Sequence, residues 1–164
     1  MLVWATYNFP PPARLLRTAR LFYWRNESHI ANKRYVTIID YTKPVLVKRL
    51  WVVEFNTGKV IFSSHVSHAY ASGLLYATKL SNAEDSEKSC NGSFVTRSTY
   101  VGRWGYALRV QGLESGNSNT LRRDIVFHAC PLPVWSKGCW MTTSATNRTL
   151  INLIKGGSFV YVTI

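Results

Sequence analysis

RLWVVEFNTGKVIFSS, residues 49–64, carries two runs of Val, Ile and aromatic residues on either side of the tripeptide Asn56-Thr57-Gly58. Residues of these types favour strands, because their branched or flat side chains pack well on a pleated surface. A short glycine-containing segment between two such runs is typical of a β-hairpin. We therefore expect a strand over residues 49–55, a turn, and a second strand over residues 60–64.

Strand patterns of the same kind continue on both sides of this hairpin. They are separated by polar or glycine-containing segments, and they comprise YVTIID (35–40), FVTRSTY (94–100), YALRVQ (106–111), DIVFH (124–128) and SFVYVTI (158–164). Helix-like spacing of apolar residues occurs in ARLLRTARLFYW (13–24) and in TLINLIK (149–155), which Gly156-Gly157 ends. Many short strands predict a mainly β domain, a sandwich or barrel with one or two short helices.

The size of the chain suits one domain, and its charge is strongly positive. Of the 164 residues 46% are apolar, which is enough for a substantial core. The formal net charge is +12, from 20 Lys and Arg against 8 Asp and Glu, and the basic residues are spread along the chain. Such a charge attracts nucleic acids, anionic cell-wall polymers and membrane surfaces, and it fits a solvated basic surface equally well. Charge alone therefore selects no function.

Cysteine usage and missing motifs exclude several classes of protein. Three cysteines, Cys90, Cys130 and Cys139, cannot form a fully paired disulfide framework, and no CxxC pair suggests a zinc ribbon. Neither a GxGxxG segment after a strand nor a GxxxxGK(S/T) loop is present, so nucleotide binding has no support. No apolar run reaches the ~20 residues that span a bilayer. Residues 1–12 lack a basic start and hold three prolines, so they are a poor secretory signal.

Cys139 is the first candidate for chemistry, because it follows Ser136, Lys137 and Gly138. A glycine before a nucleophile lets the backbone turn tightly, and the N–H groups of such a turn can bind a developing oxyanion. Lys137 adds a positive charge nearby, which favours the thiolate. Taken alone, a Gly-Cys pair is a weak signal, because a lone cysteine is more often a small buried apolar residue.

His128 is the candidate base, because it ends the apolar run Ile125-Val126-Phe127 and precedes Cys139 by 11 positions. A neutral imidazole beside a thiol takes its proton and makes a stronger nucleophile near neutral pH. The same residue can instead be a core histidine bonded to the backbone. A zinc site of His68, His128 and Cys139 is a further alternative, although no carboxylate lies nearby in the sequence to support it.

Several segments share their pattern and their order with one protein family. They are HVSH (65–68), TYVGRWGYALRVQGLE (99–114), RRDIVFHA (122–129), SKGC (136–139) and LIKGGSFVYV (153–162). Because of these shared segments, the chain from about Tyr35 to its end resembles the murein L,D-transpeptidase catalytic domain family, a branch of the YkuD-like fold. The resemblance implies a YkuD-like β-sandwich or barrel over residues 35–164, preceded by an N-terminal extension over residues 1–34 that holds a short helix.

The resemblance also implies a reaction. Cys139 would attack a peptidoglycan stem peptide at the carbonyl between an L-centre and the following D-residue, and His128 would take the thiol proton and later deprotonate the acceptor amine. The backbone amides of Gly138 and Cys139 would bind the oxyanion, and Ser136 would shape the loop. Hydrolysis is the variant in which water replaces the amine.

The resemblance further implies where the substrate lies. His68, Tyr100, Trp104 and Gly105 match family motif positions and are the expected substrate-binding residues. Neither a cofactor nor a metal is needed. The expected partner is peptidoglycan rather than nucleic acid, the expected location is the periplasm or cell envelope, and a monomer is expected.

Two departures from the family pattern keep other hypotheses open. Ala69 stands where the family usually has glycine after His68, and Trp135 replaces an arginine common before the Ser-x-Gly-Cys signature. They motivate a second hypothesis, a catalytically weakened relative that binds cell-wall polymer. A third hypothesis, a basic nucleic-acid-binding domain, rests on charge and aromatic residues and leaves the ordered motifs unexplained.

Overall fold

The computed structural model describes residues 9–164. The interpretation of residues 1–12 as a poor secretory signal therefore falls mostly outside the described residues. The long helices are α1 (Ala13–Arg25) and α2 (Ser144–Ile154), and the strands are β1 (Asn32–Asp40), β2 (Leu50–Glu54), β3 (Val60–Ser64), β4 (His68–Ala69), β5 (Gly92–Gly102), β6 (Gly105–Gly112), β7 (Val126–Ala129), β8 (Trp135–Ser136), β9 (Trp140–Thr142) and β10 (Ser158–Thr163). Short 3-10 helices lie at Glu27–His29, Tyr70–Ser72 and Ser115–Asn117.

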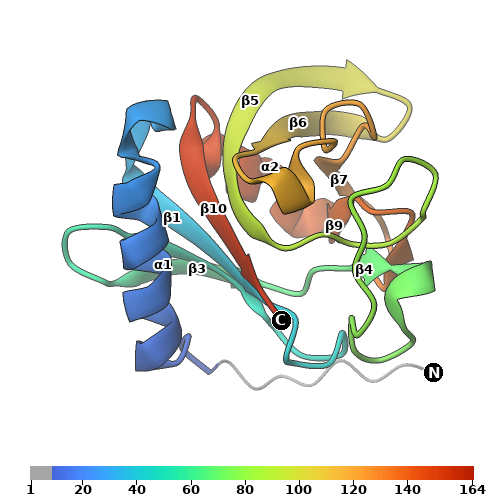
Figure 1. The fold of residues 1–164 in the computed structure, drawn as a ribbon, viewed down its shortest axis with the longest axis horizontal. Coiled ribbons are helices and arrows are strands. Elements are labelled where there is room, and N and C mark those ends of the chain that lie inside the picture. The colour runs from blue at the N-terminus through green and yellow to red at the C-terminus, as the bar shows by residue number, and fades with distance from the viewer. Residues whose placement is uncertain (1–8) are drawn as a thin grey trace.

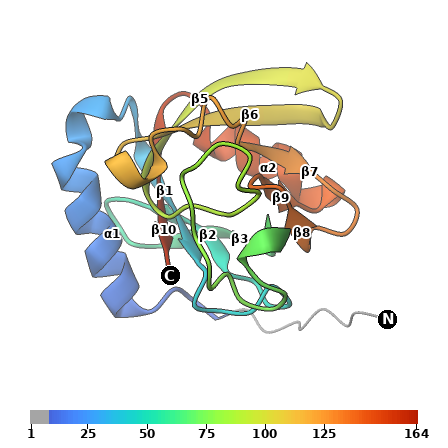
Figure 2. The ribbon, with the colours of Figure 1, turned by 45° about the vertical axis from the view of Figure 1, so that its right-hand side comes forward.

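Eight of the strands form one curved sheet in the order β3-β2-β1-β10-β5-β6-β7-β9 (Figure 1). Its pairs are antiparallel except for β1 with β10 and β7 with β9, which are parallel. The strands β4 and β8 form a separate parallel pair. The sheet bends around α2, so its two halves face each other, as expected for the predicted mainly β domain (Figure 2).

The strands β1, β2 and β10 are buried on both faces. Val36, Ile38, Trp51, Val53, Phe159 and Tyr161 pack with Leu15, Ala19 and Tyr23 of α1, whereas Ile39, Leu50, Val52, Val160 and Val162 pack with Leu150, Ile151 and Ile154 of α2. Alternate residues of a strand point to opposite faces, so each strand contributes to both clusters. This explains why the runs in the sequence are continuously apolar rather than alternating.

The predicted elements are confirmed with one clear shift in a boundary. The hairpin of β2 and β3 turns at Thr57-Gly58, where Gly58 has a φ of +73°, a conformation that glycine adopts without strain. The helix predicted over residues 149–155 begins five residues earlier, at Ser144. Its first turns are polar and mostly exposed, so they carry no apolar spacing, and the buried Asn147 is held by a hydrogen bond to the carbonyl of Tyr106.

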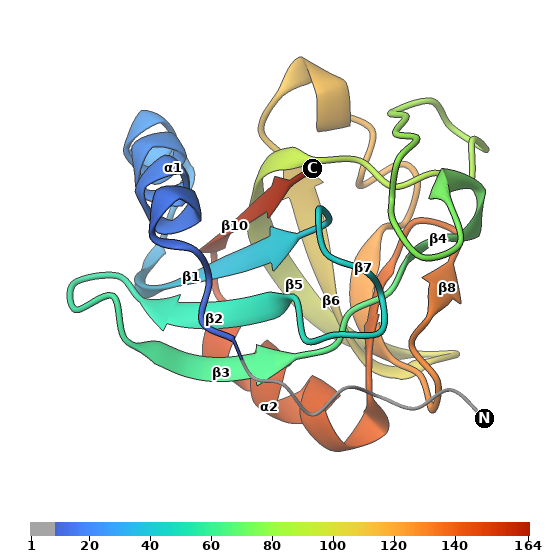
Figure 3. The ribbon, with the colours of Figure 1, turned by 90° about the horizontal axis from the view of Figure 1, so that it is seen from below.

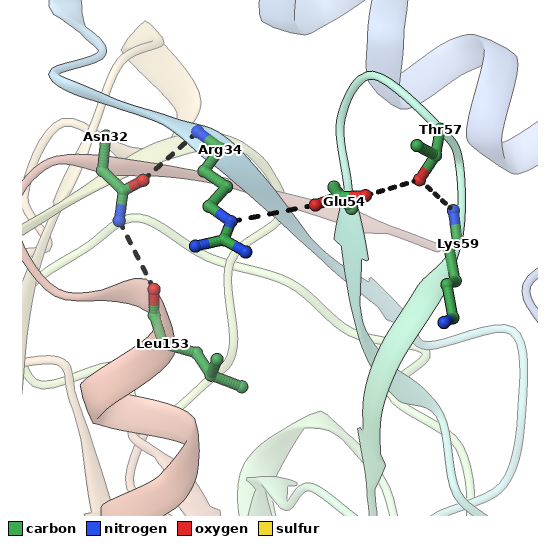
Figure 4. Close-up of polar contacts among 6 residues, drawn as sticks. All are labelled: Asn32, Arg34, Glu54, Thr57, Lys59 and Leu153. Carbon is green, nitrogen blue, oxygen red and sulfur yellow. Dashed lines mark hydrogen bonds and ion pairs between the residues drawn. The ribbon is translucent and has the colours of Figure 1, made fainter.

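The start of β1 ties the hairpin to the end of α2 (Figure 4). The Asn32 amide donates to the carbonyl oxygens of Lys155 at 3.1 Å and Leu153 at 3.4 Å, and its own oxygen accepts from the Arg34 N–H at 3.2 Å. The Arg34 guanidinium lies 3.8 Å from Glu54, whose other oxygen accepts from Thr57 at 2.8 Å. These bonds join β1 to the β2–β3 hairpin and to the end of α2, in the half of the sheet that lies away from β7 and β9.

No helix within residues 9–164 is both long enough and apolar enough to cross a membrane.

Candidate active site

The parallel pairing of β7 with β9 places the strand that holds His128 beside the strand that Cys139 precedes. In this pair Phe127 lies opposite Trp140, and their rings, 4.8 Å apart, point into the core. His128 lies opposite Met141 and therefore points the other way. Cys139 lies just before β9, at the end of the turn that contains Gly138, and it lines the same cavity as His128.

This cavity has a volume of about 590 Å³. His128 and Cys139 both line it, together with Tyr70, Glu87, Trp104, Ala129, Cys130, Pro131, Trp135, Ser136, Lys137 and Met141. Much of the lining is aromatic or aliphatic, and its polar side chains include the His128 imidazole, the Cys139 thiol and the ion pair of Lys137 with Glu87. Ligand sites commonly have this composition, an apolar wall with few polar groups.

The turn before Cys139 is held closed by Ser136. The Ser136 hydroxyl donates to the Cys139 carbonyl at 2.7 Å and accepts from the Gly138 N–H at 3.0 Å. Gly138 has a φ of +136°, which side-chain-bearing residues rarely adopt. The Gly138 N–H is bonded to the Ser136 hydroxyl, whereas no partner is found for the Cys139 N–H within residues 9–164. The oxyanion role expected of these amides stays a prediction.

Ser67 fixes the same turn from the opposite side. Its buried hydroxyl donates to the Cys139 carbonyl at 3.1 Å and accepts from the Met141 N–H at 2.9 Å. Its own N–H donates to the Met141 carbonyl at 3.0 Å. Ser67 lies between His65 and His68 in the sequence, and no local sequence pattern predicts that it holds the Cys139 turn.

The hydrogen bonds of His128 define its tautomer. Its Nδ1 lies 2.9 Å from the carbonyl oxygen of Ala129, which can only accept, so Nδ1 carries the hydrogen and Nε2 keeps its lone pair. Burial lowers the pKa of His128, and the bond to Ala129 opposes this effect. The Trp104 ring stacks on the imidazole, with centroids 5.6 Å apart and planes 21° apart. The imidazole is therefore neutral at neutral pH, and the lone pair of its Nε2 can accept a proton.

The Cys139 thiol is protonated at rest. It donates to the Asp124 carbonyl at 3.4 Å. Burial raises its pKa; a backbone hydrogen bond with Val126 lowers it, the Asp124 charge raises it and the Arg123 charge lowers it. Sequence reasoning assigned the helpful positive charge to Lys137. The structure corrects this, because the Lys137 ammonium pairs with Glu87 at 2.6 Å, and the cation that acts on the thiol is Arg123.

His68 does not line the cavity, although sequence reasoning expected it to contact substrate. Its side chain is fully buried. Nε2 donates to the Gly73 carbonyl at 2.7 Å, and Nδ1 accepts from the Arg49 guanidinium at 2.9 Å. Burial lowers the pKa of His68 to about 4, the bond to Gly73 opposes this, and the Arg49 charge adds to it. His68 thus supports the segment of Tyr70, behind the cavity wall.

Of the other residues expected at the substrate, Trp104 alone lines the cavity. It lies with Gly105 at the turn between β5 and β6, which carries its ring over His128. Gly105 has a φ of +77° and permits this turn. Tyr100 lies further back on β5, under the Arg109 guanidinium at 4.0 Å from its ring centroid, and is not part of the lining.

Trp135, which stands where the family commonly has an arginine, forms part of the cavity wall. Its indole N–H donates to the Leu74 carbonyl at 2.8 Å, and its ring meets Tyr70 edge to face at 6.1 Å. The other departure, Ala69, is buried, and its N–H donates to the Ser89 hydroxyl at 2.9 Å. Both positions therefore shape the wall rather than fill the space beside Cys139.

The zinc alternative finds no support in this geometry. Both ring nitrogens of His68 are taken by Gly73 and Arg49, which leaves no lone pair for a metal. In the described part of the chain no group of three or more His, Cys, Asp or Glu side chains is arranged to hold a metal ion.

Comparison with known proteins identifies the family. The family model described as L,D-transpeptidase catalytic domain matches residues 13–163 and so includes α1. A search of curated proteins finds no match.

Solved structures share the fold at low sequence identity. An L,D-transpeptidase from Stackebrandtia nassauensis is similar with 16% identity and a TM-score of 0.53, over 82% of this chain and 58% of that one. The helical cell shape determining protein Pgp2 (K307A mutant) from Campylobacter jejuni has 10% identity and a TM-score of 0.55, over 93% and 56%.

A fused Zn-dependent amidase/peptidase/peptidoglycan-binding domain-containing protein from Clostridium acetobutylicum has 10% identity and a TM-score of 0.54, over 96% of this chain and 65% of that one. The chain thus spans less than two thirds of the length of each of these structures. With a family match that covers nearly all of its length, a mainly β fold and a sheet that bends around one helix, the chain belongs to the L,D-transpeptidase catalytic domain family.

Proposed function

We propose that this domain is a cysteine acyltransferase that acts on peptidoglycan stem peptides in the cell envelope, with Cys139 as nucleophile and His128 as base. The observation that carries the proposal is the shared cavity: the Cys139 thiol and the His128 imidazole, whose Nδ1 is bonded to the Ala129 carbonyl, both line it. Membership of the L,D-transpeptidase family supports the substrate class.

The local chemistry favours a proton transfer that accompanies attack over a preformed ion pair. Burial raises the pKa of the Cys139 thiol and lowers that of His128, so both groups are neutral near pH 7. As the sulfur attacks the carbonyl carbon of the L,D bond, Nε2 of His128 accepts the thiol proton, and Ala129 holds the imidazolium through Nδ1–H.

The reaction has two halves, the acylation of Cys139 and the transfer of the acyl group to an acceptor. The tetrahedral oxyanion binds the Cys139 N–H, the imidazolium protonates the leaving amine of the D-residue, and a thioester remains on Cys139. An acceptor amine loses a proton to Nε2 and attacks the thioester, which releases the new amide and restores the thiol. With water in place of the amine, the product is the free acid.

The test is acylation followed by mass spectrometry. A carbapenem should add its mass to the protein on Cys139, and both Cys139→Ala and His128→Gln should reduce this labelling by at least about a hundredfold. Cys130→Ala is the matched control, because Cys130 lines the same cavity and its thiol bonds to the Leu132 carbonyl. Labelling that follows Cys130, or an unlabelled Cys139 whose thiol still reacts with iodoacetamide, would refute the proposal.

A second candidate function is a weakened relative that binds cell-wall polymer without turnover. The aromatic wall of Tyr70, Trp104 and Trp135 favours binding, since such rings pack well against sugar and peptide faces. In that case isolated peptidoglycan should sediment the Cys139→Ala variant as well as the parent chain, and no muropeptide should change in mass. Turnover of muropeptides by the parent chain would exclude it.

A further inference from the structure

The helix α1 presents an outer face that is basic and partly apolar. Arg14, Arg17, Leu21, Trp24 and Arg25 lie on it at spacings of three and four residues, and all five are exposed. The opposite side of the helix is buried on the sheet through Leu15, Ala19 and Tyr23. We call the five exposed residues the outer face of α1.

The arginines of this face lack ion-pair partners within residues 9–164. Residues 1–8 contain no Asp or Glu either, and α1 itself is free of acidic residues. The nearest acidic residue along the chain, Glu27, pairs with Lys33 at 2.8 Å. Arg20 is different, because its guanidinium donates to the Phe55 carbonyl at 2.8 Å and so holds the helix to the hairpin. Three positive charges therefore remain uncompensated on one helix face.

Two large apolar side chains stand among these charges. Leu21 is 51% exposed and Trp24 is 57% exposed. A helix on which arginines surround Leu and Trp suits the boundary between lipid headgroups and acyl chains, where the charges meet phosphates and the apolar groups leave water. A soluble polyanion would use the arginines and leave Leu21 in water.

The outer face of α1 lies away from the candidate active site. In Figures 1 and 2 α1 lies at one side of the molecule and β7 and β9 lie toward the other side. In the view from below α1 and β7 are also well separated (Figure 3). A surface bound by α1 would therefore leave the cavity of Cys139 open.

We propose that the outer face of α1 docks the domain on an anionic membrane surface. The interaction is electrostatic through Arg14, Arg17 and Arg25, and the side chains of Leu21 and Trp24 enter the interfacial layer. The inference is independent of the chemistry proposed for Cys139.

Sedimentation with vesicles tests the proposal. The full chain should bind vesicles of phosphatidylcholine mixed with phosphatidylglycerol and not vesicles of pure phosphatidylcholine. The triple variant R14Q/R17Q/R25Q should bind about a hundredfold more weakly, at roughly fivefold per arginine. The control variant K79Q/R148Q/K155Q removes the same charge from exposed positions elsewhere and should bind nearly as the parent does.

A second variant separates a lipid surface from other polyanions. Leu21→Ser removes an exposed side chain and should weaken vesicle binding about threefold or more while leaving the affinity for inorganic polyphosphate unchanged. Equal losses in the two triple variants would overturn the proposal, since net charge would then explain binding. Unchanged vesicle binding by Leu21→Ser would also overturn it and would indicate a site for a soluble polyanion.

Discussion

Arg123 shows how a single residue can serve both structure and reactivity. Its guanidinium donates to the carbonyl oxygens of Ser81 and Lys88, which joins the loop of residues 79–93 to the segment before β7. A side chain at Gly138 would lie 3.4 Å from it, so the positive charge rests directly on the Cys139 turn. The charge lowers the pKa of the Cys139 thiol.

We expect Arg123→Gln to raise the pKa of the Cys139 thiol and to slow its alkylation by iodoacetamide about three- to tenfold at pH 8. Arg123→Lys keeps a positive charge and should restore most of the rate. Lys137→Gln is the matched control, because the Lys137 ammonium already pairs with Glu87. Peptide-resolved mass spectrometry over a pH series measures the rate at Cys139. If Lys137→Gln and Arg123→Gln shift the profile equally, the assignment to Arg123 is wrong.

At the scale of elements, the candidate site depends on how the segment before β4 holds the start of β9. Ser67→Ala removes the acceptor of the Met141 N–H and a donor to the Cys139 carbonyl, both buried. We expect a loss of about 1–3 kcal/mol in the free energy of unfolding and about tenfold slower carbapenem labelling of Cys139. Chemical denaturation and mass spectrometry measure the two effects.

Ser93→Ala is the matched control for this change. Ser93 is equally buried, but its hydroxyl has no hydrogen-bond partner in the part of the chain that the structure describes. Its removal should leave the free energy of unfolding nearly unchanged or slightly higher. An equal loss in both variants would mean that packing, rather than the bonds of Ser67, holds the turn.

The sequence predicts the positions of the helices and strands well and the contacts between them poorly. Runs such as YVTIID and SFVYVTI predicted strands because β-branched residues recur in them, and the structure confirms β1 and β10. The pairing of β7 with β9, next to the cavity that His128 and Cys139 both line, joins residues across a loop and leaves no local pattern. Lys137 is the cation nearest to Cys139 in the sequence, whereas the cation that lowers the pKa of the thiol, Arg123, is distant in the sequence and acts through space. Side-chain charge partners such as Glu87 cannot be seen in a single sequence.

At the scale of the whole molecule, the two apolar clusters share the strands β1, β2 and β10, so α1, the sheet and α2 form three layers. Arg49 lies just before β2 and is fully buried, with its guanidinium bonded to the carbonyls of Lys43 and Val66 and to His68. Since burying an unpaired polar group is costly, the whole domain depends on this network remaining complete.

The network makes the stability of the domain depend on pH. Burial lowers the pKa of His68 to about 4, whereas an unfolded chain has a histidine pKa of about 6.5. Between these values the unfolded chain takes up a proton that the folded chain does not, so unfolding becomes easier as the pH falls. The stability is present in full above about pH 6.5 and is lost progressively down to about pH 4, with about 3 kcal/mol at most from His68. Protonation there would also place an imidazolium against the Arg49 guanidinium.

We therefore expect the free energy of unfolding, measured by urea denaturation, to fall between pH 6.5 and pH 4. His68→Gln should flatten this slope, because a glutamine amide can donate to Gly73 and accept from Arg49 without titrating. His29→Gln removes a histidine from the exposed surface and serves as the control. A slope unchanged by His68→Gln would place the acid sensitivity elsewhere, with the partly buried His65 and the buried His128 as the remaining candidates, because burial lowers the pKa of each.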